Sequence, residues 1–124
     1  MKFLLLHELS HVLGFCSSFF KTLGLLKTER KSGVIKNYIN SPKVLQKAII
    51  HFNCNNIKGG ELENQGGEGS LGSYWEARYM LGDYMISTDY PEKVISDITL
   101  AYFNIFDKLK NLDGYLSYFK KLNY

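Results

Sequence analysis

The strongest constraint on the fold of this chain is the pentapeptide His7-Glu8-Leu9-Ser10-His11. Its two histidines can act together only if the backbone is helical, because four residues advance an α-helix by slightly more than one turn. The apolar residues around the pair follow helical spacing rather than strict alternation, and Gly14 provides a stop. These apolar residues are Leu4, Leu5, Leu9, Val12 and Leu13. We therefore predict a helix over about residues 1 to 14.

Two further segments also have helical patterns. Ser41-Pro42 places a capping hydroxyl directly before a proline at the first helical position. Apolar residues then recur on one face, at Leu45, Ala48, Ile49 and Phe52. Pro91-Glu92 opens a similar pattern, with Val94, Ile98, Ala101, Ile105 and Leu109 on one face. We expect helices over about residues 41 to 53 and 91 to 109.

The segments between these helices are expected to be irregular. Residues 17 to 40 mix polar and apolar positions, contain two glycines and carry a basic stretch from Lys27 to Lys31, so we predict a loop with one irregular turn. Residues 57 to 72 are too rich in glycine for a regular element. The predicted fold is mostly α with long irregular Gly-rich loops, in a single domain over residues 1–124.

Composition excludes several classes of protein. A chain of 124 residues with 45% apolar and 22% charged residues is one globular domain, not a disordered or coiled-coil protein. The net charge of +3 is too small and too evenly spread to predict a nucleic-acid partner. We expect no membrane span, because no run of about 18 apolar residues exists, and no signal peptide, because the apolar start is too short. The spacing of Cys16 and Cys54 matches no zinc or redox motif, which leaves a bridge between them open.

The pentapeptide has the residue types of a zinc-activated hydrolytic site. On one helical face His7 and His11 can take two corners of a tetrahedral zinc site. Glu8 lies beside that face, where a carboxylate can accept a proton from water without binding the metal. The alternative interpretation is a chance match, in which His7 and Glu8 are a surface pair and His11 is a partly buried histidine.

Four blocks in a fixed order carry a family resemblance. They are His7 to Phe15, His51 to Cys54, Glu61 to Glu76, and Asp83 to Met85. Together they resemble the leishmanolysin family, a group of metzincin zinc metallopeptidases, over about residues 3 to 106, which leaves the tail 107–124 divergent. Gly14 stands where a metzincin helix breaks to turn toward its third ligand. The compact metzincin pattern would place a histidine at position 17, which is Ser17 here, so the likeness is to the long form.

The resemblance implies a role for each site residue. His7 and His11 correspond to the first two ligands of one Zn²⁺ ion, Glu8 to the general base, and Met85 to the methionine of the turn beneath the metal. The family's third histidine stands in a Gly-Ser-His-Trp context, where this chain has Tyr74. A phenol has a reference pKa of about 10 and must lose its proton to bind a metal well, so we expect weakened zinc affinity and turnover. Without the resemblance, Met85 would be an ordinary core methionine.

The resemblance also implies a biological setting. Family members act on protein or peptide substrates, are membrane-associated, cell-surface or secreted proteins, and are linked to cell adhesion as well as proteolysis. In them a substrate-binding sheet precedes the metal helix, whereas only six residues precede His7 here. We therefore expect a truncated metzincin-like (zincin) catalytic domain without its N-terminal sheet, from an incomplete gene model or a decayed copy. Two alternatives stay open: a catalytically inactive surface adhesion or binding protein, and a small helical domain with a chance motif.

Two other groups of residues are not expected to bind metal. His51 is not a ligand position in the family, and we expect a last-turn carbonyl or the helix dipole to satisfy it. Glu61, Glu63 and Glu68 lie among glycines whose spacing matches no calcium loop. Oligomeric state and cleavage specificity have no signal in the sequence.

Overall fold

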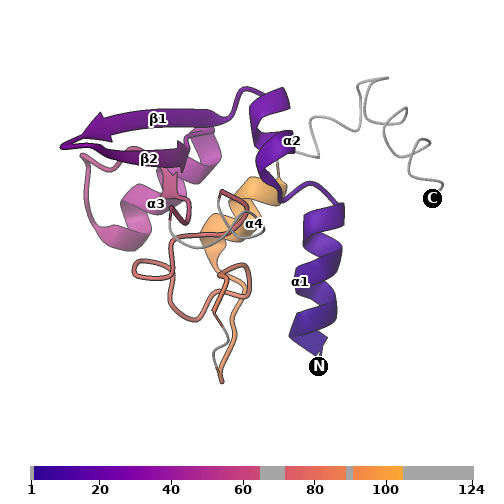
Figure 1. The fold of residues 1–124 in the computed structure, drawn as a ribbon. Coiled ribbons are helices and arrows are strands. Elements are labelled where there is room, and N and C mark those ends of the chain that lie inside the picture. The colour runs from indigo at the N-terminus through magenta and orange to yellow at the C-terminus, as the bar shows by residue number, and fades with distance from the viewer. Residues whose placement is uncertain (1, 65–71, 89–90, 105–124) are drawn as a thin grey trace.

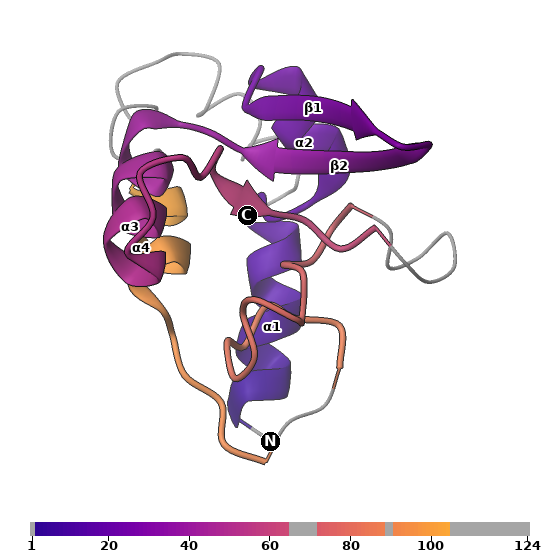
Figure 2. The same ribbon diagram turned by 90° about the vertical axis from the view of Figure 1, so that its left-hand side faces the viewer.

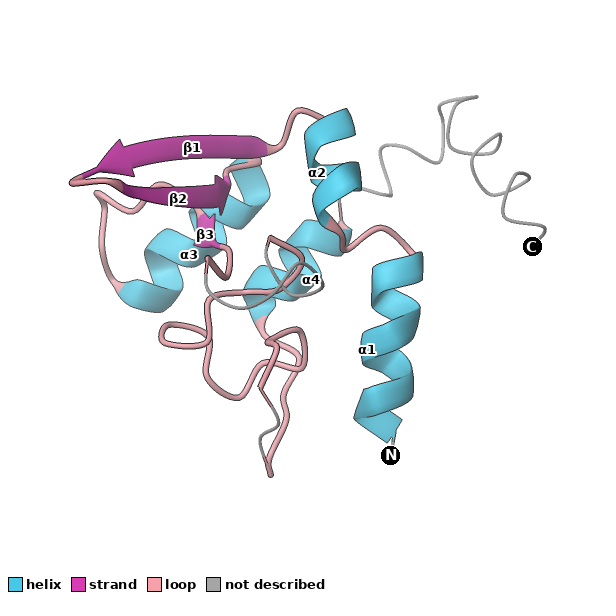
Figure 3. Ribbon diagram, viewed as in Figure 1, coloured by secondary structure: helices cyan, strands magenta, loops and turns pink. Residues whose placement is uncertain are grey.

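The computed structural model describes residues 2–64, 72–88 and 91–104. In these residues four helices accompany one antiparallel three-stranded sheet, in which the central strand is the second (Figures 1 and 3). The elements in chain order are α1 (Lys2–Val12), α2 (Ser17–Thr22), β1 (Leu26–Lys31), β2 (Val34–Ile39), α3 (Pro42–Phe52), β3 (Gly60–Glu61) and α4 (Asp97–Phe103). Helices α3 and α4 lie side by side, and α1 extends away from the sheet (Figures 1 and 2). The expected mostly α architecture is therefore not confirmed.

The prediction of a loop over residues 17 to 40 is wrong. Helix α2 and the β1–β2 hairpin occupy most of this segment. Ser32 and Gly33 form the hairpin turn, with φ angles of 52° and 76°. Two left-handed residues in succession are what a tight hairpin needs to match the twist of its strands. The charged side chains of β1 hid the strand, although Glu29 faces Lys36 across the pair as expected of neighbouring antiparallel strands.

The prediction of a helix from residue 91 is also wrong, because α4 begins only at Asp97. The amide of Val94 donates to the Gly82 carbonyl at 2.8 Å, and the Val94 carbonyl accepts the Tyr84 amide at 3.0 Å. A backbone paired in this way cannot also make helical bonds. Ser96 then caps the helix by accepting the amide of Thr99. Residues 105–109 lie outside the described part.

The other two helices are confirmed to within two residues of their expected bounds. Helix α3 starts at Pro42 after Ser41 and ends at Phe52, and Asn53 then forms a left-handed C-cap with φ 49°. In the expected irregular segment 57 to 72, the short strand β3 pairs with the end of β2. Gly60 is required there because an added Cβ would lie 2.3 Å from the Trp75 ring.

The core is built around four buried aromatic side chains, Phe15, Phe20, Trp75 and Tyr102. Their rings meet edge to face at centroid distances of 5.0 to 5.4 Å, the arrangement that aromatic quadrupoles favour. The Tyr102 hydroxyl donates to the Gly14 carbonyl at 2.6 Å and so fixes the turn after α1. This core holds the end of α1 against the segment that contains Trp75.

The N-terminal stretch Phe3–Thr22 is long and apolar enough, by length and composition alone, to cross a membrane. Core helices and signal sequences pass the same test, so it is weak evidence for a span. The structure divides the stretch between α1 and α2. The stretch is also interrupted by His7, Glu8 and His11, so it contains no uninterrupted apolar run of about 18 residues.

Candidate metal centre

The two histidines of the pentapeptide meet on one face of α1. Their Nε2 atoms lie 3.1 Å apart, and their rings are nearly perpendicular. His7 is buried, with 8% of its surface exposed, and His11 is half-buried. Helical spacing thus brings the pair together, as the sequence predicts.

Backbone carbonyls fix the tautomers of both rings. His7 Nδ1 lies 2.6 Å from the Tyr84 carbonyl oxygen, and His11 Nδ1 lies 2.6 Å from that of Phe15. Because a carbonyl oxygen only accepts hydrogen bonds, each Nδ1 must carry the proton. In the neutral rings, both Nε2 atoms are then bare lone pairs that face one another.

Two lone pairs at this distance repel unless a cation lies between them. Tetrahedral zinc with Zn–N bonds of about 2.0–2.1 Å separates two nitrogen ligands by roughly 3.3–3.4 Å. The observed 3.1 Å is close to this separation, and carbonyl-bound Nδ1 atoms are the usual outer shell of metal-binding histidines. Burial lowers the pKa of His11, and the neighbouring His7 lowers it further, against the opposing Phe15 carbonyl. The two histidines therefore fit a zinc ion in the spacing of their Nε2 atoms and in the carbonyl partners of their Nδ1 atoms.

Tyr74 lies directly against both imidazoles. Its ring stacks on His7 at a centroid distance of 5.4 Å and meets His11 edge-on at 4.9 Å. Backbone pairing holds it there, since the Tyr74 carbonyl accepts the Glu63 amide at 2.8 Å and the next amide, of Trp75, donates to the Met85 carbonyl at 3.0 Å. Within residues 2–64, 72–88 and 91–104, no three His, Cys, Asp or Glu side chains gather as a metal site.

Glu8 is exposed beside this pair and lines a cleft of about 870 Å³ together with His7 and Tyr74. The other residues that line this cleft are Phe3, Leu4, Ile86, Ser87, Thr88, Pro91, Glu92 and Lys93. A carboxylate at this position has access to water and to a molecule in the cleft.

Met85 is fully buried in the core, immediately after Tyr84. Sequence reasoning singled out Met85 but missed Tyr84, whose carbonyl binds His7. The Ser10 hydroxyl donates to the Leu6 carbonyl at 2.7 Å, so the Tyr84 hydroxyl must donate to Ser10, at 2.9 Å. Burial raises the pKa of Tyr84, which keeps this donor protonated. The turn at Tyr84 and Met85 is therefore bound to α1 twice, through the Tyr84 carbonyl and through the Tyr84 hydroxyl.

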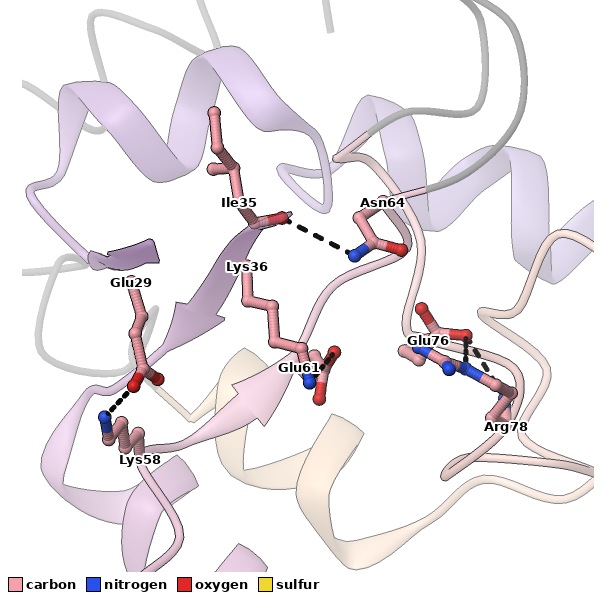
Figure 4. A network of polar contacts seen from close by, with 8 residues as sticks. All are labelled: Glu29, Ile35, Lys36, Lys58, Glu61, Asn64, Glu76 and Arg78. Carbon is pink, nitrogen blue, oxygen red and sulfur yellow. Dashed lines mark hydrogen bonds and ion pairs between the residues drawn. The ribbon is translucent and has the colours of Figure 1, made fainter. Parts of the chain in front are cut away.

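Three acidic residues in the described part of the chain, Glu29, Glu61 and Glu76, are paired with basic side chains (Figure 4). Glu76 accepts from Arg78 Nε at 3.1 Å, Glu61 lies 3.8 Å from Lys36 Nζ, and Glu29 lies 2.5 Å from Lys58 Nζ. Figure 4 also shows the Asn64 amide donating to the Ile35 carbonyl, at 3.5 Å. Glu68 lies outside the described residues.

Among the described residues, the two cysteines and His51 make no hydrogen bond or ring contact with His7 or His11. Cys16 and Cys54 are both free thiols, so no bridge joins them. His51 is exposed in the last turn of α3, with its ring 4.8 Å from that of Phe52. The expectation that a last-turn carbonyl or the helix dipole stabilises the His51 ring stays a prediction.

Comparison with known proteins decides between a chance motif and a shared ancestry. A sequence model of leishmanolysin matches residues 2–110. The chain belongs to the leishmanolysin family. This leishmanolysin relationship confirms the resemblance carried by the four sequence blocks, and the family is one of metallopeptidases.

Several leishmanolysin relatives are similar to this chain over about half of its length. A leishmanolysin-like peptidase of Drosophila melanogaster is 44% identical over 61 residues, which are 49% of this chain and 9% of the relative. A leishmanolysin homolog of Crithidia fasciculata is 40% identical over 77 residues, 58% of this chain and 12% of the relative. A leishmanolysin-like peptidase of Caenorhabditis elegans is 44% identical over 62 residues, 50% of this chain and 9% of the relative. The matched part is thus about a tenth of the length of each relative.

Proposed function

We propose that this chain is the metal-binding part of a zinc-dependent metalloendopeptidase of the leishmanolysin type, with His7 and His11 as two ligands of one Zn²⁺ ion. The observation that carries the proposal is the pair of Nε2 lone pairs facing each other at 3.1 Å, each fixed by a carbonyl on Nδ1. A metal cation relieves their repulsion without protonating either ring, and zinc is an ion that imidazole nitrogens at tetrahedral spacing favour.

The chain's own residues divide the chemistry of peptide hydrolysis between them. When bound, zinc polarises a substrate carbonyl and lowers the pKa of a water molecule. Glu8, exposed in the cleft beside His7, accepts the proton of the attacking water and passes it to the leaving amine. The carbonyls of Tyr84 and Phe15 keep both imidazoles in the tautomer that presents Nε2 to the ion.

Tyr74 takes the place of the third ligand in this proposal. A neutral phenol is a poorer ligand than imidazole, and its ring rather than a free nitrogen lies against both histidines. We therefore expect this chain to bind zinc more weakly than a three-histidine site and to hydrolyse peptides slowly.

A second candidate is a catalytically inactive relative that binds other proteins at the cell surface, in adhesion. The packing of the Tyr74 ring on both imidazoles favours it, because an aromatic ring in that place stabilises the apo site without completing a ligand set. Both proposals include a cell-surface or secreted location, and only the membership of the leishmanolysin family supports it.

The test is zinc-dependent cleavage of a quenched fluorescent peptide library by wild type, Tyr74→His and Glu8→Gln. We expect slow cleavage by wild type, cleavage by Tyr74→His that is faster by at least about tenfold, equivalent to about 1.4 kcal/mol, and none by Glu8→Gln, which should still bind zinc. A Tyr74→His chain that binds zinc but cleaves nothing would overturn the peptidase and leave the inactive relative.

A further inference from the structure

We propose that Thr99 of α4 is a positioning residue for the metal centre. Its one buried hydroxyl holds the segments that orient His7 and Tyr74. The inference rests on the proposed function, because it concerns how the same two-histidine site is held. Thr99 lies on a helix that contributes no ligand, and the sequence analysis gave it no role.

The Thr99 side chain is a two-way hydrogen-bond junction. Its Oγ1 donates to Asp83 Oδ2 at 2.8 Å and accepts from Trp75 Nε1 at 2.8 Å. Thr99 and Trp75 are 0% exposed, and Asp83 is 2% exposed. Buried polar groups of this kind are costly to leave unpaired, so the three side chains hold one another in a single arrangement.

One branch of the junction leads to His7. Asp83 immediately precedes Tyr84, and its Oδ1 accepts the amide of Met85 at 2.7 Å, on the far side of Tyr84. Its Oδ2 also accepts the Ser96 amide at 3.1 Å. The Met85 amide belongs to the same peptide as the Tyr84 carbonyl, so Asp83 fixes that peptide, and its carbonyl sets the ring orientation and tautomer of His7.

The other branch leads to Tyr74. The Trp75 indole is bound to Thr99, and the Trp75 amide donates to the Met85 carbonyl at 3.0 Å. With both its side chain and its amide held, Trp75 fixes the backbone position of Tyr74 against the imidazoles. A hydroxyl is required at position 99 because it must donate and accept at once, which valine, with nearly the same shape, cannot do.

The experiment compares wild type with Thr99→Val, Thr99→Ser and Ser96→Ala. Serine keeps the hydroxyl. Ser96→Ala removes the cap of α4 and the Ser96 Oγ contact with Thr99 Oγ1 at 3.2 Å, but leaves the hydrogen bonds of Thr99 with Asp83 and Trp75 in place, which makes it the control for a loosened helix. Zinc affinity is measured by competition with a chromophoric chelator. The tautomer of His7 in the metal-free chain is read from long-range ¹H–¹⁵N NMR correlations.

We expect Thr99→Val to bind zinc about tenfold more weakly and to lose the single Nδ1–H tautomer of His7, while Thr99→Ser and Ser96→Ala stay close to wild type. The inference would be overturned if Thr99→Val kept the zinc affinity and the His7 tautomer of wild type. It would also be overturned if Ser96→Ala lost as much zinc affinity as Thr99→Val. Should Thr99→Val fail to fold, Asp83→Asn, which replaces one of the two accepting carboxylate oxygens by an NH2 donor and so breaks the link at Thr99 or at Met85, must give the same two losses. If wild type itself binds no zinc, the proposed function fails, while the tautomer comparison still decides the role of Thr99.

Discussion

At the scale of single residues, the arrangement of His7 and His11 is costly without a cation. Each ring gives its Nδ1 proton to a backbone carbonyl, so the two Nε2 atoms have no proton to share unless one ring becomes an imidazolium. Burial lowers the pKa of His11 and opposes that charge. A chain that keeps this geometry gains stability from any ion that binds between the rings.

Tyr74→His is the substitution that tests the third position. An imidazole in place of the phenol adds a ligand that is neutral at pH 7, so we expect zinc to bind at least about 1.4 kcal/mol more tightly, a tenfold lower Kd by calorimetry. Tyr79→His, at a tyrosine that is 47% exposed, is the matched control and should leave the Kd unchanged. Equal affinity in wild type and Tyr74→His would mean that position 74 does not face the ion.

Side chains with a distinctive chemistry were predictable at this scale, and backbone groups were not. The pentapeptide named His7, Glu8 and His11, and the family resemblance pointed to position 74. The Tyr84 carbonyl that binds His7 carries no signal in residue type, because every residue has one. The Thr99 junction was hidden for a related reason, since its partners lie 16 and 24 residues away in the sequence.

At the scale of elements, the β2–β3 pair depends on a glycine. Gly59 has φ 143°, and an added Cβ would lie 2.2 Å from the Ile39 carbonyl oxygen, whereas Gly24, with φ 65°, has open space around it. We expect Gly24→Ala to cost about 1–2 kcal/mol from backbone strain alone, and Gly59→Ala at least about 3 kcal/mol, because the strand must also move. Chemical denaturation followed by circular dichroism measures both, and equal losses would contradict the packing at β3.

The pKa of Glu61 predicts a pH-dependent effect in the same sheet. Burial raises this pKa, and Lys36 opposes the shift only in part. A carboxyl whose pKa is higher in the folded state contributes stability at pH below its unfolded value of about 4.3 and loses it as the pH rises through the folded value. We therefore expect Glu61→Gln to melt at a higher temperature than wild type at pH 7, and the difference to disappear near pH 3.

The exposed Glu92→Gln is the control for this pH effect, with no expected difference at either pH. A Glu61→Gln chain that melts below wild type at pH 7 would show that the ion pair with Lys36 outweighs the cost of burying the carboxylate.

Elements with one clear apolar face were predictable, and elements defined by pairing were not. Helix α3 follows from its proline start and its apolar period. Strand β1 was missed because an exposed edge strand carries charges where a buried one carries apolar residues. The start of α4 was placed too early because Val94 has the right spacing for the helix, but its backbone pairs with the Gly82–Tyr84 turn.

At the scale of the whole molecule, α1 presents an apolar stripe to solvent. Leu5, Leu9 and Val12 recur along one side of the helix and are 74%, 44% and 42% exposed. His7 and Ser10, which the molecule buries, lie on the other side. An apolar stripe of this kind promotes association.

We therefore expect the purified chain to self-associate in analytical ultracentrifugation, and the double variant Leu5→Gln, Leu9→Gln to shift it toward monomer. Ile50→Gln, at an isoleucine that is 65% exposed on α3, is the control and should leave the association unchanged. If all three chains sediment alike, the α1 stripe is not a contact surface.

The most direct test of the central claim is the zinc stoichiometry of the purified chain beside His11→Ala. The facing Nε2 atoms predict one zinc ion per wild-type chain and no bound zinc after His11→Ala, which removes one of the two nitrogens. A wild-type chain that binds no zinc, or a His11→Ala chain that binds it equally well, would contradict the assignment of His7 and His11 as the metal ligands.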